Sequence, residues 1–154
     1  MTLVPLTSIW ARSIWFQMIS AELIYSFLLE VQDDFVPRLW ERVNIREYAN
    51  KLASNAVNLY TEEEDIIGMA CFYANQPPDA FLSLIVIKNE YKRKGHFKDL
   101  FHRVIQYLKE NNFSTLRLEV SRDNLVAYKA YKKLGFEFEK DSDLTNHDIL
   151  FMGI

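Results

Sequence analysis

A short basic segment with a single glycine could bind phosphate groups. Residues 91–100 read YKRKGHFKDL and place Gly95 among lysines and one arginine. Apolar residues then recur at helical spacing from Phe97 to Leu108, so the segment opens an amphipathic helix. The first turn of a helix leaves N–H groups without carbonyl partners and carries the positive end of the helix dipole. The segment therefore predicts an anion site at the start of this helix.

The positive charge of this segment is local. Between Lys88 and Arg103, six Lys or Arg residues stand against two acidic residues, in a chain whose formal net charge is −3. A solvated basic run at a helix start would give the same pattern without a ligand, and the charge alone leaves both interpretations open. An acidic chain with no other basic and aromatic stripe argues against a nucleic acid partner.

Two strands and a second helix are expected to hold this segment. Phe81–Ile87 is an apolar run typical of a buried strand, and Thr115–Val120 alternates as a second strand. After it, Asn124 opens a helical pattern that ends at Gly135, where a helix end favours a residue that tolerates positive φ. Alternating strands and helices of this kind predict an α/β fold.

Together these residues resemble the GCN5-related N-acetyltransferase (GNAT) superfamily. The acetyl-CoA loop of that family reads Gln/Arg-x-x-Gly-x-Gly/Ala, and a later helix often reads Asn-x-x-Ala-x-x-x-Tyr-x-x-x-Gly-Phe. Here the loop corresponds to residues 92–97 and the helix to residues 124–136, within a likeness that covers about 64–138. Lys92 replaces the family's Gln/Arg, and Phe97 stands where the family has a small residue. We expect CoA binding to be retained, with Phe97 turned inward, because any residue supplies the backbone N–H groups that bind phosphate.

The resemblance implies a single N-acetyltransferase domain over residues 1–154. Its fold class is α/β, with a central mixed, mostly antiparallel sheet that is splayed between the family's fourth and fifth strands and has helices on both faces. Residues 1–60 would form a divergent, helical N-terminal part, 61–138 the acetyl-CoA-binding core, and 139–154 the closing loop and strand. A chain of 154 residues with 49% hydrophobic content is large enough for one packed core.

The N-terminal part shows helical spacing over 18–31 and again from Ile45 to Ala56. Residues 1–15 hold two of the three tryptophans, which either pack in the core or form a binding or dimer surface. The apolar stretches are too short and too interrupted for a membrane span or a signal peptide. The single Cys71 is expected to be a core residue rather than a nucleophile, and its lack of a disulfide partner fits a reducing cytoplasm.

The resemblance also assigns cofactor contacts. In this family pantetheine pairs like a strand with the backbone that precedes the loop, and the pyrophosphate meets the loop and the helix start. The predicted cofactor-binding residues are Ile85, Val86, Ile87, Arg93, Lys94, Gly95, His96, Phe97, Lys98 and Asn124. Asn124 is equally well explained as the N-cap of its helix. The three histidines have no spacing typical of a ligand set, so we expect no metal.

Attack of an amine on a thioester requires a neutral amine, a proton acceptor, and a donor for the departing thiolate. The resemblance places Tyr131 where the family has the tyrosine that serves the sulfur, and a phenol with a pKa near 10 remains a donor at neutral pH. It places Glu119 where related N-terminal amine acetyltransferases have a carboxylate, which makes it the candidate base. The alternatives are core packing for Tyr131 and, for Glu119, a solvated face shared with Arg117. Tyr128 lies off the face of Tyr131 and is expected to pack or to lie on the surface.

The sequence thus predicts an acetyl-CoA-dependent N-acetyltransferase. It would transfer acetyl to a primary amine of an unidentified small-molecule or peptide acceptor by direct attack. The expected location is cytoplasmic, without a nucleic acid or membrane partner, and a homodimer stays open. Asp141, Asp143 and Asp148 either attract a cationic amine or form an ordinary polar loop. The alternative function is a non-catalytic CoA-binding or protein-interaction module of the same fold, which Phe97 favours.

Overall fold

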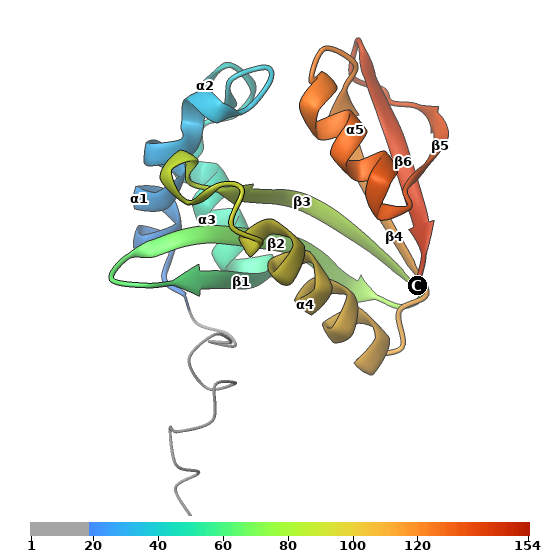
Figure 1. The fold of residues 1–154 in the computed structure, drawn as a ribbon, viewed down its shortest axis with the longest axis horizontal. Coiled ribbons are helices and arrows are strands. Elements are labelled where there is room, and N and C mark those ends of the chain that lie inside the picture. The colour runs from blue at the N-terminus through green and yellow to red at the C-terminus, as the bar shows by residue number, and fades with distance from the viewer. Residues whose placement is uncertain (1–18) are drawn as a thin grey trace, which may run out of the picture.

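One mixed sheet of six strands, in the order β1-β2-β3-β4-β6-β5, organises residues 19–154, the part of the chain that the computed structural model describes. Neighbouring strands are antiparallel except β3 and β4, which run parallel. The strands are β1 (Val57–Glu62), β2 (Ile66–Gln76), β3 (Asp79–Ile87), β4 (Thr115–Ser121), β5 (Glu137–Asp141) and β6 (His147–Gly153). The predicted α/β fold with a mixed, mostly antiparallel sheet is confirmed (Figure 1). The two interpretations of residues 1–15 concern a segment outside the described residues.

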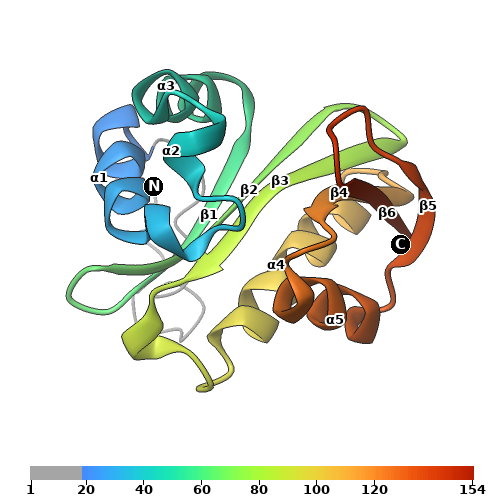
Figure 2. The ribbon, with the colours of Figure 1, turned by 90° about the horizontal axis from the view of Figure 1, so that it is seen from above.

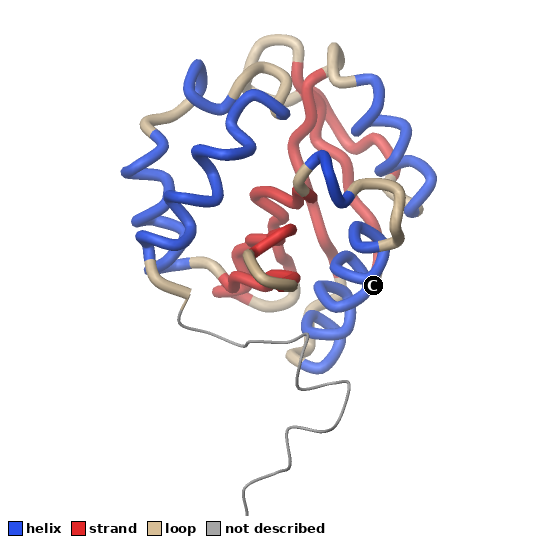
Figure 3. Tube along the Cα trace, turned by 60° about the vertical axis from the view of Figure 1, so that its left-hand side comes forward, coloured by secondary structure: helices blue, strands red, loops and turns tan. Residues whose placement is uncertain are grey.

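Helices cover both faces of the sheet (Figures 1 and 3). They are α1 (Ala21–Val31), α2 (Leu39–Arg42), α3 (Ile45–Asn55), α4 (His96–Glu110) and α5 (Leu125–Leu134), with 3-10 turns at Gln32–Asp34 and Asn89–Tyr91. Buried side chains of α1 and α3 form one hydrophobic cluster with one face of β2 and β3, and α4 forms a second cluster with the opposite face and with β4. None of the described helices is long and apolar enough to cross a membrane.

Local sequence signals set the ends of these helices. Ser20 caps α1 by accepting a hydrogen bond from the N–H of Leu23 at 3.2 Å, and Asn44 caps α3 by accepting from Glu47 at 3.0 Å. Gly135 ends α5 with a φ of 109°, the left-handed conformation predicted for it. The four-residue α2 was not predicted, because so short a segment shows no periodicity.

A β-bulge in β3 marks the point where the sheet opens. The register of β3 against β2 shifts at Ser83, which is the extra residue of the bulge. Before the bulge, Leu82 packs in the cluster of α4; after it, Leu84 packs in the cluster of α1 and α3. The parallel pairing of β3 with β4 also ends at Leu82.

Beyond the bulge, β3 and β4 diverge and divide the sheet into two arms (Figures 1 and 2). One arm consists of β1, β2 and β3 with α1, α2 and α3, and the other of β4, β6 and β5 with α5. The two strands pair only over Asp79–Leu82 and Thr115–Leu118. The split therefore separates the strand of Ile85–Ile87 from the strand of Glu119, as the family resemblance implies. Counted along the described residues, these are the third and fourth strands.

Candidate active site

The loop that leads into α4 presents backbone donors without acceptors. In the described part of the chain, the N–H groups of residues 93–98 make no backbone hydrogen bond, and the first bond of the helix runs from Asp99 to the carbonyl of Gly95 at 3.1 Å. No side chain caps this helix start. Several N–H groups thus remain without acceptors at one helix terminus, which is an arrangement that binds anions.

Gly95 gives the loop its shape. It stands at the N-cap of α4 with a φ of 87°, and a Cβ added there would find no heavy atom within 4 Å. The left-handed φ explains why glycine occupies the position. The open space beside it leaves room for a ligand against the backbone.

The loop cations are available to an anion. Lys92, Arg93, Lys94 and Lys98 are exposed, and none forms an ion pair with a residue that the structure describes. Lys88 differs from them, because its ammonium lies 2.5 Å from the carboxylate of Glu30 on α1. The positive charge at the helix start therefore comes from three loop residues and from Lys98 in the first turn of α4, without Lys88.

Phe97 packs against the core cluster of α4, so its ring is turned inward as expected. His96 is partly buried, and its ring lies edge-on to Tyr91 with centroids 6.5 Å apart. Neither side chain replaces the backbone N–H groups at the helix start.

A second set of backbone groups, on the edge of β3 that faces the split, pairs with no strand in the described part of the chain. Lys88 donates its N–H to Ile67 of β2 at 2.8 Å. Backbone direction alternates along a strand, so Val86 also turns its N–H and C=O toward β2, whereas Ile85 and Ile87 turn theirs toward the split. Of the three predicted pantetheine contacts, the geometry thus favours Ile85 and Ile87.

Two side chains of α5 occupy the positions that the sequence motif gave them. Asn124 caps the helix by accepting from the N–H of Ala127 at 3.2 Å, which is the structural role proposed as an alternative. Tyr131 packs on the core, edge-on to Phe136 with ring centroids 5.8 Å apart. Its hydroxyl makes no hydrogen bond with any described residue, and burial raises the pKa of Tyr131 to about 12. The phenol is therefore a proton donor that has no acceptor among residues 19–154.

Glu119 lies on β4 at the split, with its side chain 22% exposed. Ser142, in the loop between β5 and β6, donates its hydroxyl to one carboxylate oxygen. Across the split, Nη2 of Arg42 lies 3.7 Å from the other oxygen, Oε1. Arg117, in contrast, bonds Glu139 and Asp79 at 2.8 Å each. Glu119 is therefore not part of a solvated Arg/Glu face.

His147 is a further polar group of this region that the sequence did not single out. It pairs with Ser121 on the neighbouring strand and is 7% exposed. Its Nδ1 lies 2.9 Å from the carbonyl of Thr145, which can only accept, so Nδ1 is the donor of this bond. Nε2 is buried without a hydrogen-bond partner among the described residues. Neither Arg42 nor His147 belongs to a motif, so no sequence signal could have found them.

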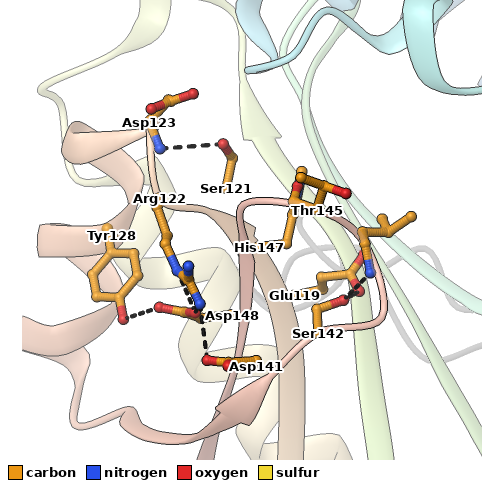
Figure 4. A network of polar contacts seen from close by, with 11 residues as sticks. Glu119, Ser121, Arg122, Asp123, Tyr128, Asp141, Ser142, Thr145, His147 and Asp148 are labelled. Atoms are coloured by element: carbon orange, nitrogen blue, oxygen red, sulfur yellow. Dashed lines mark hydrogen bonds and ion pairs between the residues drawn. The ribbon is translucent and has the colours of Figure 1, made fainter.

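A second polar cluster joins the end of β4 to β5, β6 and α5 (Figure 4). Arg122 donates to Asp148 and to Asp141 at 2.8 Å each, and Tyr128 donates its hydroxyl to Asp148 at 2.8 Å. Burial and then this bond to Asp148 raise the pKa of Tyr128. Asp141 and Asp148 thus share the guanidinium of Arg122, and a second oxygen of Asp148 accepts from Tyr128, which favours the interpretation of an ordinary polar loop over a site for a cationic amine. Tyr128 packs against the core cluster of α4, as expected, and its hydroxyl donates this hydrogen bond in addition.

The remaining candidates have structural roles or none. Cys71 is fully buried in the cluster of α1 and α3, and burial raises the pKa of its thiol, as suits a core residue. Among the residues described, no group of three His, Cys, Asp or Glu side chains is placed to hold a metal ion.

The sequence model of the acetyltransferase (GNAT) family matches residues 21–136, more than half of the chain. Streptothricin acetyltransferase A of Bacillus subtilis is 33% identical over 81 residues, which cover 53% of this chain and 47% of that protein. The [ribosomal protein bS18]-alanine N-acetyltransferase of Haemophilus ducreyi is 32% identical over 88 residues, which cover 56% of this chain and 60% of that protein. The chain thus spans about half the length of these curated relatives.

The fold also matches solved structures. The PaiA N-acetyltransferase of Thermoplasma acidophilum, solved in complex with coenzyme A, superposes with a TM-score of 0.73. It is 22% identical in sequence, over 92% of this chain and 99% of that one. At this level of identity the match concerns the fold alone.

Proposed function

Because this chain belongs to the acetyltransferase (GNAT) family, we propose that it is an acetyl-CoA-dependent N-acetyltransferase. It transfers the acetyl group to a primary amine of an acceptor by direct attack. The observation that carries the proposal is the row of N–H groups at residues 93–98 that find no acceptor in the described part of the chain, beside four exposed cations that form no ion pair there.

The cofactor follows the split between the arms. Its pyrophosphate binds the N–H groups of the loop, with Arg93, Lys94 and Lys98 supplying charge, and Gly95 lets the backbone approach the phosphates. The pantetheine arm pairs with the outward backbone groups of Ile85 and Ile87 in the way an added strand would.

The proposed reaction uses Tyr131 as the donor to the departing sulfur and Glu119 as the acceptor of the proton from the amine. When acetyl-CoA is bound, its thioester carbonyl carbon is the point of attack for the lone pair of the acceptor nitrogen. The new C–N bond forms as the C–S bond breaks and its electron pair leaves with the sulfur. Tyr131 donates a hydrogen bond or a proton to that sulfur, for which its pKa of about 12 keeps the phenol neutral. Glu119 accepts the proton released from the nitrogen, through a water molecule.

The non-catalytic alternative depended on Phe97 as an obstacle in the loop. The ring of Phe97 packs on the core instead, so this feature no longer favours a binding module.

Thiol release from acetyl-CoA across amino sugars, peptides, polyamines, antibiotics and amino acids tests the activity. Release above the no-acceptor rate with at least one amine supports the proposal. Stoichiometric CoA binding with no release from any amine would favour the module.

The assigned phosphate site has its own test. The double substitution Arg93→Ala and Lys98→Ala should weaken CoA more than a pantetheine fragment without the pyrophosphate, and CoA binding should weaken with salt. A matched control is Lys109→Ala with Lys133→Ala, which removes two exposed cations elsewhere. Equal losses for CoA and for the fragment would place the phosphates elsewhere.

A further inference from the structure

Arg117 and Arg122, on the arm of β4, β6 and β5, use their guanidinium donors differently from Arg42 at the split. Arg117 and Arg122 each make two hydrogen bonds of 2.8 Å to carboxylates. Arg42, the last residue of α2, makes none with the described residues, although its side chain is only 32% exposed. Its guanidinium donors are therefore not used by the described residues and are available to a ligand at the split.

The partner that Arg42 does have is Glu119, on the opposite arm. Nη2 lies 3.7 Å from Oε1, close enough for an ion pair but too long for a hydrogen bond. The other oxygen of Glu119 is held by Ser142. One guanidinium and one carboxylate oxygen thus face each other across the split, and both retain capacity for hydrogen bonds.

We propose that the acceptor carries a carboxylate beside its amine, as a free α-amino acid does, and that Arg42 binds this carboxylate while Glu119 receives the amine. The inference rests on the proposed function and names the acceptor class for the same site. The planar fork of arginine matches a carboxylate in a bidentate manner. A single guanidinium also suits a monoanion better than a phosphate, which carries more charge and more acceptor oxygens.

The charge pattern sets this class apart from other amines. A peptide N-terminus has an amide where an amino acid has its carboxylate, and amino sugars and polyamines have no carboxylate at all. These acceptors would leave the donors of Arg42 unmatched. An acceptor with both charges replaces the loose ion pair by two direct contacts, one on each arm of the sheet.

The test compares the twenty standard L-amino acids with their amides as acceptors in thiol release from acetyl-CoA. At least one acid should exceed its amide by tenfold or more in kcat/KM. For that acid, Arg42→Gln should lower kcat/KM by roughly 10- to 100-fold, the range of a lost hydrogen bond to a charged group, and should change the amide less than about threefold. Arg38→Gln is the control, because Arg38 lies on the same segment, is 58% exposed and faces Asp33; it should change neither acceptor.

Amides or amines used as well as the acids, with Arg42→Gln without effect, would overturn the inference and leave the proposed function standing. If no amino acid releases thiol, titration calorimetry of the acids against the protein–CoA complex decides. Binding of an acid over its amide that Arg42→Gln abolishes would support the acceptor class even though turnover is absent. Absence of such binding would overturn it, while the proposed function is judged by the wider amine panel.

Discussion

The segments that join β3 to α4 and β4 to α5 differ in whether their polar groups have partners among the described residues. Both are turns that lead from a strand into a helix, one on each arm of the split sheet. Before α4, the N–H groups of residues 93–98 make no hydrogen bond with the described residues, and Lys92, Arg93, Lys94 and Lys98 form no ion pair with them. Before α5, Asn124 caps the helix and Arg122 bonds two carboxylates. The junction before α4, called the unmatched junction, therefore keeps exposed donors and cations available to an anion, whereas the junction before α5, called the matched junction, uses its polar groups within the protein.

The same contrast recurs within α5. Tyr128 donates to Asp148 at 2.8 Å, whereas Tyr131, one helical turn later, has no acceptor among the described residues. The two tyrosines thus form a matched pair in which removal of one oxygen should affect different properties. Activity should depend on Tyr131, and stability on Tyr128.

The largest effect is expected from Tyr131→Phe. The substitution keeps the ring packed on Phe136 and removes the donor to the departing sulfur. Turnover should fall by roughly ten- to ten-thousandfold, the range of a lost general acid, with little change in CoA affinity. Steady-state thiol release and CoA titration measure the two quantities. Turnover close to that of the wild type would show that Tyr131 only packs in the core.

Tyr131 should also affect how the stability of the protein depends on pH. Burial raises the pKa of Tyr131 to about 12, above the value near 10 of an unfolded tyrosine. Its contribution to stability is therefore complete below about pH 10 and is lost as the pH rises toward 12. Chemical denaturation between these pH values should show a shallower loss of stability in Tyr131→Phe than in the wild type.

Gly95→Val tests the unmatched junction. A valine at a φ of 87° should lower the free energy of unfolding by about 1–2 kcal/mol, and its branched side chain would occupy the space beside the loop backbone. A hundredfold excess of CoA over its Kd, which should stabilise the wild type by about 2.7 kcal/mol, should then give no shift in melting temperature. Gly153→Val is the control, since Gly153 has no positive φ and a Cβ there meets nothing within 4 Å. An undiminished CoA shift in Gly95→Val would show that this loop is not the phosphate site.

Arg122→Gln tests the matched junction. The change removes two charge-assisted hydrogen bonds and leaves Asp148, whose side chain is 8% exposed, without its cation. Because Arg122 is itself 46% exposed, solvent screens part of the loss, and we expect a measurable destabilisation that is smaller than that from breaking a buried ion pair. Urea unfolding measures it, with the exposed Arg38→Gln as a control near zero. Turnover per folded molecule should remain within about threefold of the wild type; a much larger loss would mean that this cluster acts on the chemistry.

Local patterns explain why one junction could be predicted from the sequence. The glycine, the basic run and the apolar stripe of α4 are contiguous, and the cap at Asn124 and the end at Gly135 belong to one helix. Periodicity also predicted α1, α3 and the strands that flank the split. Each of these predictions depends on neighbouring residues, whose spacing is fixed by helix and strand geometry.

The other groups of the site depend on contacts between distant segments. Arg42 meets Glu119 only because the short α2 lies opposite β4 across the split. Likewise, Asp148 accepts a hydrogen bond from Arg122 because β6 pairs with β4, and no local sequence pattern predicts that pairing. The bulge at Ser83 could not be predicted from the sequence either, because one extra residue in an apolar strand leaves the composition of that strand unchanged.

Tyr128→Phe is expected to have the smallest effect of these substitutions, and it is compared directly with Tyr131→Phe on the same helix. It removes a hydrogen bond to a buried carboxylate that Arg122 continues to neutralise, so the destabilisation should be about 1 kcal/mol. The bond contributes to the raised pKa of Tyr128, because the phenol donates its proton to Asp148 and resists losing it beside that negative charge. Its share of stability should thus persist through neutral pH and fade above about pH 10, where an unfolded tyrosine ionises. Turnover should stay near the wild-type value, opposite to Tyr131→Phe on the same helix. If Tyr128→Phe lost activity and Tyr131→Phe lost only stability, the roles of the two tyrosines would be exchanged, and the donor to the sulfur would belong to the Asp148 cluster.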